Sequence, residues 1–99
     1  MAELLPKVLT LKTCSNDINT IHADNSNVGI TIWSILSSTI NAPNNTGGLL
    51  ISFSRFHSGN NLKVSFEIYI PATKGLSIVH RVIYQEGSNP KFIGEWIEL

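Results

Sequence analysis

Six polar or aromatic side chains in the second half of the chain could together bind a hydroxyl-rich ligand. Arginine, histidine and tyrosine can donate hydrogen bonds to hydroxyl groups, and an indole face complements the C–H face of a sugar ring. Asn-rich loops at residues 24–27, 41–45 and 57–61 add polar contacts, because recognition usually lies on loops carried by a rigid scaffold. We therefore expect a binding site for a neutral, hydroxylated ligand such as a glycan. Its candidate residues are Arg55, His57, Tyr69, Arg81, Tyr84 and Trp96.

Structural roles compete with the binding role for several of these residues. Trp96 lies in an apolar stretch, where an indole ring would pack in the core or between subunits. Trp33 could likewise stack on a sugar ring, or it could pack in the core or between subunits. Arg81 would pair diagonally with Glu67 across a hairpin, as a surface ion pair that adds little stability.

Catalytic and metal-binding patterns are missing from the sequence. His22, His57 and His80 supply enough imidazoles for a zinc ion, but they are too widely spaced for a compact ligand pattern. No Gly-x-Ser-x-Gly turn supports a nucleophile, and Glu95 and Glu98 point to opposite faces of a predicted strand. We expect no enzyme activity, no metal ion and no cofactor.

Composition limits the class of protein. The 99 residues are enough for one domain, which we predict to span residues 1–99 with residues 1–10 as a lead-in segment. Seven basic residues balance seven acidic ones, which argues against a nucleic-acid surface. Cys14 is the only cysteine, so an internal disulfide is excluded. No apolar run is long enough to cross a bilayer, and we expect no membrane insertion and no cleavable export signal.

The stretch from residue 62 to residue 84 has the clearest periodicity in the chain. Alternate residues from Leu62 to Ile70 are apolar, and a second run with the same period extends from Leu76 to Tyr84. A turn at 71–75 joins them, which predicts a β-hairpin in which Ile70 faces Leu76. In this register the two apolar faces coincide, and we expect that joint face to be buried.

The reverse side of this hairpin carries Val79 and Ile83 among polar residues. Two such aliphatic side chains are unusual on a fully solvated face, so another segment or another copy of the chain should cover them. We therefore predict Val79 and Ile83 as oligomer-interface residues.

The remaining elements complete a mainly β (α+β) fold. Residues 5–11 form an edge strand or a lead-in, and residues 15–21 are consistent with about two turns of helix. Further strands are predicted at 30–36, 49–54 and 92–99. The sequence thus predicts a small antiparallel β-sheet meander with one short helix.

The order of several short motifs resembles the knob-like C-terminal domain of phage tail fibres and R-type pyocin fibres. The motifs that carry this resemblance are Asp17–Ile21, Gly29–Ile32, Asn41–Pro43, Gly48–Phe53, Phe66–Tyr69, Val79–Arg81 and Trp96–Leu99. The chain departs from the family pattern at Ile93, where the family tends to have tryptophan, and at Thr31 or Ile32, where it has an aromatic residue.

The resemblance implies a homotrimeric module of an elongated virion tail fibre or pyocin particle that functions outside the cell. Such a module would attach to a bacterial surface receptor, for which a glycan is the expected class. Two alternatives remain open at this point. One is a structural trimerisation or spacer domain without a ligand, and the other is a small phage-encoded inhibitory protein.

Overall fold

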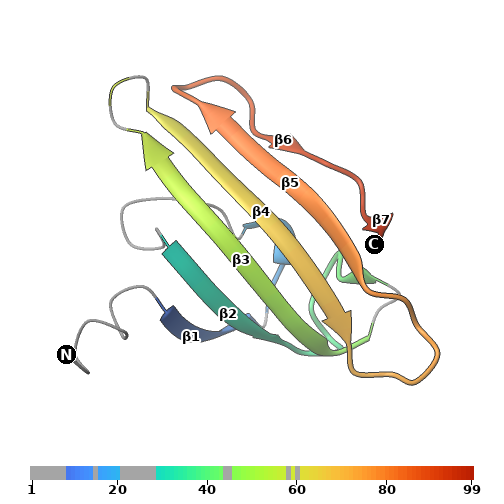
Figure 1. The fold of residues 1–99 in the computed structure, drawn as a ribbon. Coiled ribbons are helices and arrows are strands. Elements are labelled where there is room, and N and C mark those ends of the chain that lie inside the picture. Colours follow the sequence, from blue (N-terminus) through green and yellow to red (C-terminus); the bar gives the residue numbers. More distant parts are fainter. Residues whose placement is uncertain (1–8, 15, 21–28, 44–45, 58, 60) are drawn as a thin grey trace.

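Most of the chain forms a single β-sheet in the computed structural model, which describes residues 9–14, 16–20, 29–43, 46–57, 59 and 61–99 (Figure 1). None of the described residues belongs to a helix long and apolar enough to cross a membrane. The elements in chain order are β1 (Leu9–Cys14), the 3-10 turn η2 (Ile18–Thr20), β2 (Gly29–Ile35), β3 (Gly48–His57), β4 (Leu62–Pro71), β5 (Val79–Glu86), β6 (Phe92–Ile93) and β7 (Ile97–Glu98).

The sheet is open, seven-stranded and mostly antiparallel, which confirms the predicted antiparallel β-sheet. Its strand order is β1-β2-β3-β4-β5-β6, and β7 also pairs with β5. The exception to the antiparallel arrangement is β1, which pairs in parallel with β2 at the edge of the sheet. The edge strand predicted at 5–11 is confirmed at residues 9–11 and continues to Cys14, and residues 5–8 lie outside the described residues.

The helix predicted at residues 15–21 is wrong, because the described part of this segment contains only the single turn η2. The backbone N–H of Ile18 donates to the carbonyl of Ile40 at 3.0 Å, and the N–H of Asn19 donates to Asp17 Oδ1 at 2.9 Å. These partners replace the i→i−4 bonds of a helix, as short polar side chains often do. The segment is held as an irregular strap across the sheet.

The β4–β5 hairpin forms, with a register two residues away from the predicted one. Tyr69 pairs with Val79 and Ile68 with His80, because the connection extends over residues 72–78 instead of 71–75. A shift of two residues keeps every side chain on its expected side of the sheet. The apolar residues of β4 and β5 therefore still share one face.

The prediction that this apolar face is the buried one is wrong. The connection between β2 and β3 and η2 both lie on the other side of the sheet, behind β4 and β5 in Figure 1. They cover a face that includes several polar residues, among them Ser52, Ser65 and Glu67. The core on this covered face consists of Ile18, Ile35, Ala42, Leu50, Tyr69 and Val79, with Trp33 and Trp96 packed against it.

The predicted last strand, 92–99, is interrupted by a β-bulge. Ile93 pairs with Ile83 and Gly94 N–H donates to the Val82 carbonyl at 2.8 Å, whereas Ile97 pairs with His80. Two residues, Glu95 and Trp96, therefore oppose Arg81 alone. A bulge changes the direction of the side chains at the insertion, and here it brings Trp96 onto the covered face.

Candidate functional site

The six predicted ligand residues divide into two groups on opposite faces of the sheet. Tyr69, Arg81 and Trp96 come together on the covered face, where Tyr69 and Arg81 are buried. Arg55, His57 and Tyr84 lie on the other face, which we call the open face, and all three are exposed. The structure therefore does not bring the six residues together at one site.

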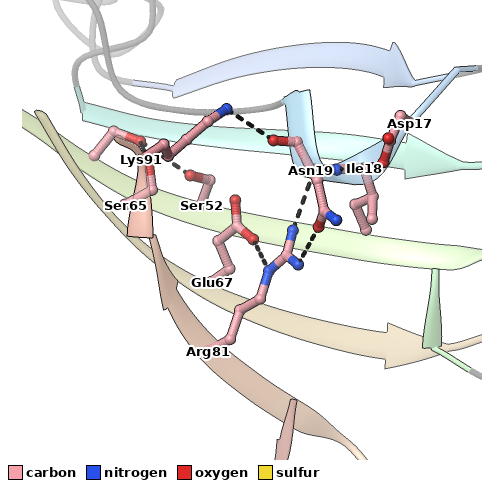
Figure 2. Close-up of polar contacts among 9 residues, drawn as sticks. Asp17, Ile18, Asn19, Ser52, Ser65, Glu67, Arg81 and Lys91 are labelled. Carbon is pink, nitrogen blue, oxygen red and sulfur yellow. Dashed lines mark hydrogen bonds and ion pairs between the residues drawn. The ribbon is translucent and has the colours of Figure 1, made fainter. Parts of the chain in front are cut away.

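An ion pair between Glu67 and Arg81 lies at the centre of the covered face (Figure 2). Arg81 Nε donates to Glu67 Oε1 at 2.7 Å, and both side chains are buried. The two residues are direct cross-strand partners in β4 and β5. The expectation of a diagonal pair at the surface is therefore wrong.

Arg81 also holds η2 against the sheet. Its terminal nitrogens donate to Asn19 Oδ1 at 2.5 Å and to the Ile18 carbonyl at 3.1 Å, while Lys91 Nζ donates to the Asn19 carbonyl at 2.9 Å (Figure 2). The guanidinium lies 4.2 Å from the ring centroid of Trp96, a cation–π contact. Arg81 is thus committed to the fold and is not presented to a ligand.

A second polar contact fastens the same segment to the β2–β3 connection. Asn41 Nδ2 donates to Asp17 Oδ1 at 2.9 Å, and Asn41 adopts a positive φ of 65°. This hydrogen bond, followed by the one from the Asn19 backbone, lowers the pKa of Asp17. Asp17 therefore supports the strap best when it is ionised.

Buried polar groups around Glu67 are only partly satisfied. Ser54 shares hydrogen bonds with Ser52 at 3.0 Å and with Ser65 at 3.1 Å, but Glu67 Oε2 has no hydrogen-bond partner among the described residues. Burial raises the pKa of Glu67, while Arg81 acts in the opposite direction. A raised carboxyl pKa is a property of general acids, but this carboxyl is sealed under η2 and beyond the reach of a substrate.

The larger part of the open face is apolar. Strand pairing aligns three rows of side chains across β2, β3, β4, β5 and β7, and we call these the apolar rows. Their only polar members are Ser34 and His80. The other members are Ile30, Ile32, Leu49, Ile51, Phe53, Phe66, Ile68, Ile70, Val82 and Ile97.

The open face changes character towards the β3–β4 turn, in a region that we call the aromatic end. Its two rows are Arg55, Val64, Tyr84 and Phe92, and then His57, Leu62 and Glu86. The rings of Tyr84 and Phe92 are stacked with centroids 4.9 Å apart, and these residues are 46% and 48% exposed. Arg55, His57 and Tyr84 are therefore brought to the same end of one face.

Sequence reasoning missed Phe92 as a member of this group. The turn at residues 87–90 joins β5 to β6, so Tyr84 and Phe92 stand directly opposite one another. Residues 84 and 92 are equally far in sequence from residue 88, which lies in this turn, and this symmetry was the signal in the sequence. A two-strand hairpin about that turn places residues 84 and 92 in register.

Val79 and Ile83 are buried within the single chain, with exposures of 9% and 1%. Their prediction as interface residues is corrected by this burial, because side chains enclosed by their own chain cannot contact a neighbour. The sequence left open whether another segment or another copy of the chain covers these two residues. In the structure another segment of the same chain covers them. Trp33 likewise packs against the core.

No cluster of three His, Cys, Asp or Glu side chains suited to a metal ion occurs among the described residues. His57 and His80 share the open face but lie three rows apart, and His22 falls outside the described residues. The predicted contact loop at 24–27 is also outside them, as are parts of the loops at 41–45 and 57–61.

In comparisons with known proteins, no family model, curated protein or solved structure matches the chain. Its function therefore has to be inferred from two surfaces of its own. These are the apolar rows and the aromatic end of the open face.

Proposed function

We propose that the chain is a non-enzymatic module of a phage or pyocin tail fibre that attaches the particle to a bacterial surface receptor. The module lies at or near the fibre tip, functions outside the cell as a homotrimer, and binds a glycan. The observation that carries the binding role is the aromatic end, where Arg55, His57 and Tyr84 lie together with Phe92.

The aromatic end has the chemistry that a neutral sugar requires. The stacked, half-exposed rings of Tyr84 and Phe92 offer an apolar platform for the C–H face of a pyranose. Arg55 lies one strand away from Val64, the direct partner of Tyr84, and its guanidinium can donate to sugar hydroxyls. His57, one row closer to the turn, supplies another polar group at the rim.

The placement of the family-like motifs supports the fibre assignment. The Gly29–Ile32 and Gly48–Phe53 motifs begin β2 and β3, and the Phe66–Tyr69 motif lies within β4. The Val79–Arg81 motif begins β5, and the closing motif contains β7. Five of the seven motifs thus contain or overlap a strand of the sheet, whereas Asn41–Pro43 lies in the β2–β3 connection and Asp17–Ile21 contains η2.

The binding role is tested by substituting the aromatic end and measuring attachment. Tyr84→Ala and Arg55→Ala should each lower binding of the assembled protein to host cells and to its glycan on an array by roughly 5-fold or more, since stacking and charged hydrogen bonds each contribute about 1–3 kcal/mol. Lys74→Ala, in the exposed β4–β5 connection, is the matched control. Unchanged binding by folded variants of both residues would refute the binding role.

A purely structural trimerisation or spacer domain is the second candidate. It is favoured by the burial of Tyr69 and Arg81 and by the packing of Trp96 against the core, since these three residues are half of the predicted ligand residues. This candidate predicts that substitutions at Arg55, His57 and Tyr84 leave host attachment intact. The same binding assay therefore separates the two candidates.

A further inference from the structure

The apolar rows are too large and too apolar to remain in contact with water. We propose that copies of this chain associate through the apolar rows, each copy covering these rows on a neighbour. The inference deepens the proposed function, on which its trimeric form rests, because it names the surface by which the module assembles. It places the interface on the opposite side of the sheet from Val79 and Ile83.

The area of the apolar rows is sufficient for a stable interface. Leu49, Phe53, Phe66, Ile70 and Ile97 are 47%, 42%, 50%, 36% and 58% exposed. With full residue areas on the order of 200 Å², these five alone expose about 500 Å² of surface, near the upper end for the largest apolar patch of a monomer. The half-buried members add to it, so the total approaches the roughly 800 Å² that each partner contributes to a standard interface.

The charge distribution favours another copy over a partner of different chemistry. None of the residues of the apolar rows is Lys, Arg, Asp or Glu, so the rows offer nothing to a charged peptide or a nucleic acid. The chain also has a net charge of zero, so its copies do not repel each other. The uncharged apolar rows of one copy can therefore pack against the same rows of another copy.

The open face also has hollows that suit packing against a facing sheet. A groove of about 550 Å³ runs past Leu49, Ile70 and Pro71, and another of about 310 Å³ lies between Ile30, Phe53 and Phe66. Hollows of this kind receive the side chains of a facing sheet, which packs at about 10 Å. Around a threefold axis, three sheets would turn their apolar rows inward and leave the aromatic ends near the turns.

The contacts on the covered face explain why η2 and the β2–β3 connection leave these rows open. Both η2 and the β2–β3 connection are fastened to the opposite side by Arg81, Lys91 and the Asp17–Asn41 hydrogen bond. These described segments therefore cannot also cover Phe53 and Phe66. Among the described residues no segment covers these rows, and a second copy of the chain is the covering that the inference assigns to them.

The test is the mass of the intact chain in solution, by light scattering and sedimentation, for the wild type and for matched variants. Phe66→Asp places a charge in the middle of the rows and should raise the dissociation constant at least about 30-fold. Phe66→Thr keeps a strand-forming residue and should weaken association less, which guards against misfolding. Ile40→Asp is the control, because Ile40 is apolar and 61% exposed but lies outside the open face.

A monomeric wild type, or a Phe66→Asp variant that is folded and associates as tightly as wild type, would overturn the inference. So would a wild type that is monomeric and binds phosphatidylcholine vesicles, since a lipid surface would then be the occupant. Failure of the receptor assay at Tyr84 and Arg55 with assembly intact would refute only the binding role. The two proposals therefore fail separately.

Discussion

Replacing Arg81 with methionine should destabilise the protein strongly, and much more than the same replacement at Arg55. Arg81→Met removes the partner of Glu67 Oε1, and Glu67 Oε2 already lacks a hydrogen-bond partner in the part of the chain that the structure describes. Removing one member of a buried ion pair typically costs about 3–5 kcal/mol. The variant also loses the hydrogen bonds that hold η2 at Asn19 and Ile18, and the cation–π contact with Trp96.

A cost of this size is a large part of the roughly 5–15 kcal/mol that stabilises an average domain. The double variant Glu67→Met/Arg81→Met removes the orphaned charge and should recover at least about half of the loss. Arg55→Met is the matched control, because Arg55 is exposed on the same sheet, and its effect should stay within about 0.5 kcal/mol.

The assay is urea unfolding followed by the fluorescence of Trp33 and Trp96, both of which pack against the core. Protein concentration must be fixed, because association makes apparent stability depend on it. A loss below about 1 kcal/mol for Arg81→Met would refute the reasoning. A double variant less stable than the single one would refute it as well.

Other predictions concern pH and the bulge. Burial raises the pKa of Glu67 above its usual 4.5, so its contribution to stability is complete below pH 4.5 and is lost as pH rises through the raised value; urea titrations should show this decline in wild type and not in Glu67→Gln. The pKa of Asp17 is lowered from 3.8 by its hydrogen bond with Asn41, so its contribution is present above pH 3.8 and is lost as pH falls through the lowered value; Asp17→Asn should remove that acid-side loss. Gly94→Ala would place a Cβ 2.8 Å from a backbone carbonyl oxygen of β5 and should cost about 1–3 kcal/mol in thermal or urea unfolding, whereas Ser88→Ala, in the neighbouring turn, should be nearly neutral.

Alternation of residue types was sufficient to predict the central strands and the hairpin but not which face is covered. The pattern from Leu62 to Ile70 shows only that the two sides of β4 differ. Which side the rest of the chain covers depends on contacts distant in sequence, such as Arg81 with Asn19 and Asp17 with Asn41. The apolar face of a strand is normally the buried one, whereas here the apolar rows are exposed in the single chain.

Two local features could not be predicted for the same reason. The bridge between Asp17 and Ile40, with the hydrogen bond from the Ile18 N–H to the Ile40 carbonyl, replaces a helix that residues 15–21 would otherwise favour. The bulge at Glu95 and Trp96 depends on how the last segment pairs with β5, which no residue in that segment reveals. For the candidate site, the exposure of Arg55 and His57 at the end of β3 was predictable. The burial of Arg81 and Tyr69 was not, because it depends on η2 and on the β2–β3 connection.

The most direct test of the account is oxidative footprinting of the wild-type chain by hydroxyl radicals, read by mass spectrometry. In the single chain Phe53, Phe66, Tyr84 and Phe92 are similarly exposed, between 42% and 50%. Association through the apolar rows predicts strong protection of Phe53 and Phe66 and continued labelling of Tyr84 and Phe92. Equal labelling of all four rings at concentrations where the chain is assembled would contradict it.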